Sequence, residues 1–102
     1  MKEQCLEQGM KLAQHLQTLG TRAYLAKSPD DYAVLGKSSQ EALNDLEKIT
    51  CLAENERKVL VDEIAYLQRG CDKADFLMVG NAGERLLRLL HDPQSYIQVY
   101  GR

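Results

Sequence analysis

Apolar residues recur every three or four positions along most of the chain, which is the spacing of an amphipathic α-helix. The first such stripe lies between about Lys2 and Leu19 and comprises Cys5, Gly9, Leu12, Leu16 and Leu19. No segment before residue 96 alternates between apolar and polar residues as a strand does. The pattern therefore predicts an all-α fold, a small bundle of four to six helices that forms a single domain over residues 1–102.

The clearest helix start is the sequence SPDD at Ser28–Asp31. Ser28 suits the N-cap position, and Pro29 suits the first helical position, where its missing N–H has no partner to lose. Asp30 and Asp31 place negative charge at the positive end of the helix dipole, and Asp31 stands where a carboxylate completes a capping box. We expect helix capping here and not a metal-binding pair of carboxylates.

Glycines and polar stretches predict where the helices end. Gly20 is expected to end or loosen the first helix, and residues 21–27 either continue that helix or begin a new turn. Gly36 is expected to separate a short helix over residues 29–36 from a longer one that begins near Ser39. The sequence leaves open whether these two glycines break the helices or are tolerated within them. The capping-box spacing of Ser38 and Glu41 supports that second start. The polar stretch 54–58 favours a bend between two helices.

In the last third of the chain, three more breaks are predicted. Gly70 is placed to end a helix, and Asp72 can cap a short segment that continues through Val79. Gly80–Gly83 then forms a break before a helix that begins near Ala82.

The C-terminal region carries more apolar side chain than chain ends usually do. Its helix has an apolar arc wider than one neighbouring helix requires, and packing within the monomer or against a partner would both account for it. After Asp92 and Pro93, alternating residues indicate an ordered, extended tail, with a last helical turn as the alternative. We predict a protein-binding surface formed by Leu86, Leu87, Leu90, Tyr96, Ile97, Val99 and Tyr100.

Charge and composition narrow the classes of partner. The chain of 102 residues has a formal net charge of −2 with both signs well mixed, so no strong field attracts nucleic acid or an anionic membrane. No apolar run approaches the roughly 20 residues that span a bilayer, and no signal-peptide core is visible. We therefore expect a cytoplasmic protein in which Cys5, Cys51 and Cys71 are reduced thiols.

No motif has the spacing of a catalytic, metal or cofactor site. The two histidines, His15 and His91, are expected at a core edge and in the last turn of a helix, where a positive or polar group suits the dipole. The sequence GNAG at Gly80–Gly83 precedes a helix, but it lacks the lysine and the spacing of phosphate-binding loops. The sequence thus predicts no enzyme activity, no metal site and no cofactor.

The sequence favours a protein that acts by binding another protein. Antiactivators of transcription factors, anti-sigma-like binders and secretion chaperones share this size, acidity and lack of motifs, a similarity of architecture alone. We expect a regulator that masks a surface of a protein partner such as a transcription regulator, and we expect a two-fold homodimer. The alternatives are a secretion chaperone, a small helical ligand-binding or catalytic domain that uses Cys51 or Cys71 with a histidine, and a DNA-binding regulator.

Overall fold

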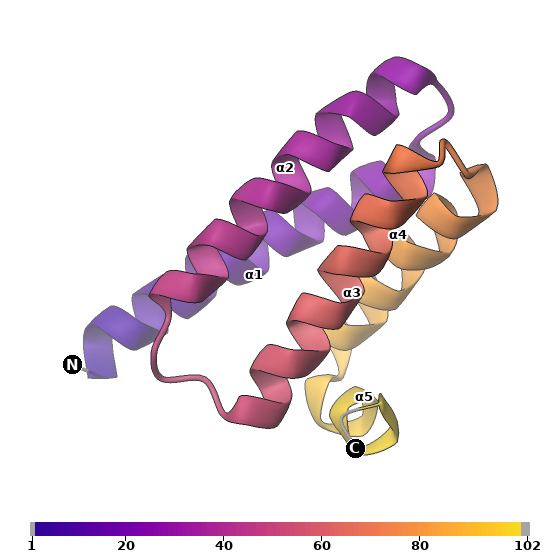
Figure 1. Cartoon of the computed structure of the whole chain (residues 1–102). Helices are drawn as coiled ribbons and strands as arrows, with labels where there is room; N and C mark the ends of the chain where they lie inside the picture. The colour runs from indigo at the N-terminus through magenta and orange to yellow at the C-terminus, as the bar shows by residue number, and fades with distance from the viewer. Residues whose placement is uncertain (1, 101–102) are drawn as a thin grey trace.

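Four long helices run alternately up and down, and a short fifth helix lies at one end of them (Figure 1). The structure is a computed structural model that describes residues 2–100, with side chains for 7–93, 95, 96 and 98. Its helices are α1 (Lys2–Leu25), α2 (Pro29–Lys48), α3 (Glu54–Asp72), α4 (Phe76–His91) and α5 (Pro93–Tyr100). No residue in this described part belongs to a strand, so the all-α prediction is confirmed.

Each long helix packs against its neighbours in the chain, and α1 packs extensively on α4 to close the bundle. The α1–α2 and α3–α4 connections lie together at one end, whereas the α2–α3 connection and α5 lie toward the other (Figure 1). The principal extents are 41 × 26 × 18 Å. The accessible surface is 6891 Å², against roughly 5,800 Å² usual for this mass, because an elongated, flat bundle exposes more area.

The helix α2 begins as predicted. The Ser28 hydroxyl accepts a hydrogen bond from the Asp31 N–H, and the Asp31 carboxylate accepts one from the Ser28 N–H, which completes the capping box. Pro29 occupies the first turn. A hydrogen bond from the Lys27 N–H, with those from Ser28, lowers the pKa of Asp31 below its ordinary value.

The glycines do not divide the helices where the sequence predicted. The helix α1 runs through Gly20, α2 runs through Gly36, and α4 runs through Gly80–Gly83. The expected division of residues 29–48 into two helices and the break at Gly80–Gly83 are therefore wrong. Gly20 and Gly36 are tolerated within their helices, which is the alternative that the sequence left open. A Cβ atom on Gly83 would lie 2.6 Å from the Gly20 carbonyl oxygen, so these two glycines admit a neighbouring backbone and do not end a helix.

The α3–α4 connection also differs from the predicted one. The helix α3 ends at Asp72, two residues after Gly70, and Asp75 takes the capping role expected of Asp72. The Asp75 carboxylate accepts a hydrogen bond from the Met78 N–H at the start of α4. Between the helices, Ala74 adopts a φ of 49°, which is uncommon for a residue with a side chain.

The bend expected over residues 54–58 lies earlier in the chain. The α2–α3 connection spans residues 49–53, and α3 already begins at Glu54. The Arg57 guanidinium donates hydrogen bonds to the carbonyl oxygens of Leu46 and Ile49 at the end of α2. The Leu46 carbonyl also accepts a hydrogen bond from the Ile49 N–H, and the Ile49 carbonyl lies beyond the end of the helix. By bonding to both carbonyl groups, Arg57 ties the start of α3 to the end of α2.

The core takes one apolar stripe from each long helix, in agreement with the helical spacing of the sequence. Its most deeply buried side chains include Leu16, Leu19, Leu46, Ile64, Leu67, Val79 and Leu86. A smaller cluster of Val59, Leu89 and Tyr96 attaches α5 to α3 and α4. Since residues Pro93–Tyr100 form a helix, the predicted extended tail is wrong and the alternative of a last helical turn fits.

Candidate protein-binding surface

The residues that the sequence predicted to bind a partner are only partly accessible. Leu86 and Tyr96 are buried within the protein itself, and Leu87 and Leu90 are half-buried along α4. The side chains of Ile97, Val99 and Tyr100 lie outside the described residues. The wide apolar arc of α4 is thus used mainly inside the monomer, which is the alternative that the sequence left open.

A buried polar cluster accounts for the position of Tyr96. Glu63 is only 3% exposed, and its carboxylate accepts a hydrogen bond of 2.6 Å from the Arg85 guanidinium. Arg85 also donates to the Tyr96 hydroxyl at 3.2 Å and lies 5.1 Å from the centre of the Tyr66 ring. Burial raises the pKa of Tyr96 to about 12. The cluster joins α3, α4 and α5, so Tyr96 has a role within the fold.

Large apolar side chains are exposed at the end of the bundle where α1 ends and α4 begins. We call this set the end face, which comprises Tyr24, Leu25, Val34, Phe76 and Leu77. Leu77 is the most exposed of them, at 73%. The exposed residues Met10 and Val61 lie farther along the bundle, in α1 and α3. Clustered exposure of this kind is typical of interaction sites.

Helix contacts place the end-face residues at the same end of the bundle. Because α1 and α4 are antiparallel and packed together, the end of α1 lies beside the start of α4 (Figure 1). The backbone nitrogen of Tyr24 would lie 2.6 Å from a Cβ atom on Gly83, and Phe76 precedes Gly83 by about two helical turns on the same side of α4. On the other side of α1, Leu25 and Val34 line one pocket.

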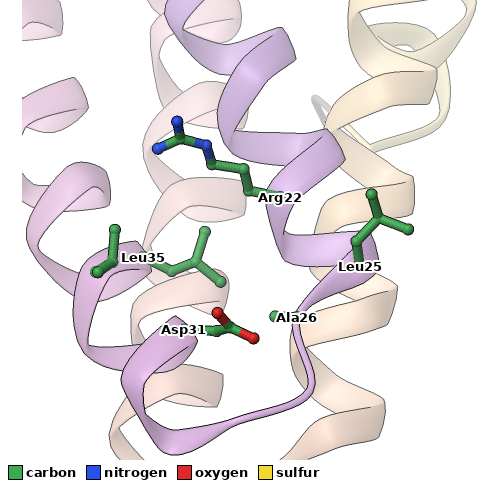
Figure 2. Close-up of a pocket in the computed structure, with 6 residues that line it drawn as sticks. Arg22, Leu25, Ala26, Asp31 and Leu35 are labelled. Carbon is green, nitrogen blue, oxygen red and sulfur yellow. The ribbon is translucent and has the colours of Figure 1, made fainter.

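That pocket opens between α1 and α2, with a volume of about 300 Å³. Its lining residues are Arg22, Leu25, Ala26, Asp31, Val34 and Leu35. Figure 2 shows the Arg22 side chain reaching from α1 toward α2 on one side of Leu35, with Asp31 on the other side. The pocket therefore has an apolar floor and a charged group on each rim.

A second groove, of about 350 Å³, lies between α1, α3 and α4 and extends to the start of α5. Leu90, a residue of the predicted binding surface, is one of the residues that line it. Its walls are almost entirely aliphatic, with Glu56 as the charged residue among those that line it. Ligand sites usually add several polar groups that fix the orientation of the ligand, and this groove offers few.

Three residues across α1 and α2 have the order of a hydrolytic triad. His15 Nε2 lies 3.1 Å from Ser38 Oγ, and His15 Nδ1 lies 3.7 Å from an Asp45 carboxylate oxygen. Acyl transfer also requires donors aimed at the oxyanion. Ser38 stands within α2, where backbone N–H groups are already used by the helix, so we assign the three residues to holding α1 against α2. Ser38 therefore does not cap a second helix as predicted.

Neither Cys51 nor Cys71, the two cysteines of the catalytic alternative, has the properties of a reactive thiol in this structure. Cys51 is disulfide-bonded, so the prediction of a reduced thiol is wrong for this residue. Cys71 is free and buried, and burial together with the charge of Asp72 raises its pKa to about 11. A thiol with such a pKa is a weak nucleophile at neutral pH. The side chain of Cys5 lies outside the described residues.

The described part of the chain also lacks two other classes of feature. Among residues with described side chains, no three of His, Cys, Asp or Glu are grouped as metal ligands. None of the helices over residues 2–100 has both the length and the apolar character of a membrane span. Comparison with protein-family models, with curated proteins and with solved structures finds no significant match.

Proposed function

We propose that this chain is a non-enzymatic regulatory protein that binds a protein partner through the end face and masks a surface that the partner needs. The observation that carries the proposal is the exposure of five large apolar side chains at one end of the bundle, whereas only Met10 and Val61 are exposed elsewhere among the large apolar side chains that the structure describes. Covering each such side chain fully is worth roughly 1.5–3 kcal/mol, so a complementary partner gains substantially by binding there. The proposed binding site thus moves from the C-terminal residues to the end face.

The proposed mechanism is competitive masking, as in antiactivators. The bundle presents the end face to a surface that the partner uses for its own dimerisation or docking, and a transcription regulator is the expected class of partner. Lys27, Asp30 and Lys73 are exposed charged residues in or beside the α1–α2 and α3–α4 connections at the same end of the bundle, and they suit the polar rim of a protein interface. A secretion chaperone would use the same face, and the identity of the captured protein distinguishes the two.

The test is affinity capture from the native cell with three versions of the chain. Wild type and the Met10→Asp variant should recover the same specific protein, because Met10 is exposed but lies away from the end face. The Leu25→Asp, Leu77→Asp double variant should lose it while keeping its helical circular dichroism. Equal recovery by all three, or recovery of no specific protein, would contradict the proposal.

The homodimer expected from the sequence is a separate proposal, and light scattering tests it. A dimer that persists in the Leu25→Asp, Leu77→Asp variant would leave the end face free for a partner. A dimer that dissociates in this variant would show that a second copy of the chain occupies the end face. The partner protein would then have to replace that second copy in order to bind.

A further inference from the structure

We infer that the partner engages the α1–α2 pocket through one large aliphatic side chain, with an Asp or Glu about one helical turn away that pairs with Arg22. This inference rests on the proposed function and specifies the chemistry of the partner at one part of the end face. The occupant is an amphipathic helix, because residues three or four positions apart on a helix are about 5–6 Å apart and point to the same side.

The apolar floor of the pocket determines which kind of partner side chain can enter it. Leu25 is 62% exposed and Val34 is 55% exposed, and both line the pocket together with the smaller Ala26. A volume of about 300 Å³ exceeds that of a single aliphatic side chain, so a leucine or isoleucine enters without displacing either helix. A partner residue of this kind would cover apolar surface that the isolated chain leaves in water.

Arg22 determines which charge the partner must carry beside the pocket. Its guanidinium lies on the rim (Figure 2), and among the described side chains no carboxylate comes within ion-pair distance of it. The half-buried Arg85 of α4, by contrast, is paired with Glu63 at 2.6 Å. An arginine fork beside an apolar pocket matches a carboxylate in geometry as well as in charge.

Asp31 on the opposite rim fixes the direction of the occupant. Its carboxylate accepts hydrogen bonds from the Lys27 and Ser28 N–H groups and faces the positive end of α2, so much of its charge is balanced locally. An acidic partner group placed beside Asp31 would still be repelled, whereas the same group beside Arg22 is attracted. The acidic residue of the partner therefore lies on the Arg22 side of the aliphatic one.

The test uses a displayed library of amphipathic helical peptides, selected against the full-length chain. Enriched peptides should combine a leucine or isoleucine with an Asp or Glu three or four residues away. Arg22→Gln should weaken their binding about tenfold, as expected for loss of a charged hydrogen-bonded pair. Selection against Arg22→Glu should enrich Lys or Arg at the former acidic position. Lys37→Glu, an exposed cation on α2 outside this pocket, is the matched control and should leave the selection unchanged.

The outcomes separate this inference from the proposed function. If binding is lost in Val34→Asp but peptides show no acidic preference and ignore Arg22→Glu, the inference fails and binding through the end face stands. If enriched peptides bind Leu25→Asp, Val34→Asp and wild type equally, the proposed function fails as well. Absence of any enriched peptide, or dimerisation of the wild type that Val34→Asp abolishes, overturns the inference. Circular dichroism of each variant confirms that it is folded.

Discussion

Gly83 of α4 packs so closely on Gly20 of α1 that a single added methyl group on Gly83 would approach the Gly20 carbonyl oxygen to 2.6 Å. The same Cβ would lie 2.6 Å from the Tyr24 backbone nitrogen, and backbone atoms cannot move aside as a flexible side chain can. The contact therefore sets the spacing of α1 and α4, the most extensive helix pairing in the bundle. It also fixes the position of the end-face residues of α1 relative to those of α4.

We expect Gly83→Ala to lower the free energy of unfolding by about 2–3 kcal/mol, because the helices must separate to admit the methyl group. Gly80→Ala is the matched control, since a Cβ there meets nothing within 4 Å. That variant should gain up to about 1 kcal/mol from better helix propensity. Urea unfolding of both variants measures the difference, and similar stabilities for the two would show that α1 and α4 do not pack as described.

These glycines show where prediction from sequence is limited. The stripes of leucines and the Ser28 cap depend on residues three or four positions apart, and both were predicted correctly. The role of Gly20 depends on Gly83, which is distant in the sequence, so local propensity gave the wrong role. A helix break and a close helix contact both favour glycine, and only the packing distinguishes them.

The candidate surface was missed for a related reason. The run from Phe76 to Val79 contains four consecutive apolar residues, a composition typical of a buried segment. In a helix, four consecutive residues point around the whole circumference, so only part of such a run can face the interior. Val79 is buried, whereas Phe76 and Leu77 are exposed. The sequence analysis placed the binding surface at the C-terminal leucines instead. The number of apolar residues in a segment does not show whether a neighbouring helix of the same chain covers them.

The Glu63–Arg85 pair predicts a large cost for removing its cation. In Arg85→Met the Glu63 carboxylate, almost fully buried, would lose its ion-pair partner at 2.6 Å. We expect a loss of about 2 kcal/mol, less than for a fully buried pair, because Arg85 is partly exposed and water can replace some of the interaction. Arg88→Met breaks the exposed pair with Glu84 and should cost at most about 0.5 kcal/mol. Equal losses in chemical unfolding would contradict the buried role of Arg85.

Two buried acids predict a loss of stability at high pH. Burial raises the pKa of Cys71 from 9.0 to about 11 and that of Tyr96 from 10.0 to about 12. The folded protein thus retains protons that the unfolded chain releases, so stability is unaffected below about pH 9 and falls as the pH rises toward about 12. In Tyr96→Phe the fall above about pH 10 should be shallower. Urea midpoints across this range measure the slopes, and an unchanged slope in Tyr96→Phe would refute the assignment.

Ala74 predicts a substitution that stabilises the fold. Its φ of 49° brings Cβ close to the neighbouring carbonyl, at a cost of roughly 1–2 kcal/mol that glycine does not incur. After allowing for the greater freedom of glycine in the unfolded chain, we expect Ala74→Gly to raise stability by about 0.5–1 kcal/mol. Ala33→Gly, on the exposed side of α2, should instead lower it by about 1 kcal/mol. Thermal unfolding of the pair distinguishes the two, and a loss in both would exclude a left-handed residue 74.

The contrast between Leu86 and Leu77 tests which apolar residues hold the fold and which are free to bind. Both are leucines of α4, yet Leu86 is 0% exposed and Leu77 is 73% exposed. Leu86→Ala should cost about 2–5 kcal/mol through lost burial and the cavity left behind. Leu77→Ala should change stability by no more than about 0.5 kcal/mol, since its side chain is already in water. If Leu77→Ala proved as costly as Leu86→Ala, Leu77 would belong to the core and the end face would lose its most exposed member. If Leu77→Ala leaves the stability unchanged, the Leu77 side chain does not stabilise the fold. A partner can then bury this side chain without disturbing the core.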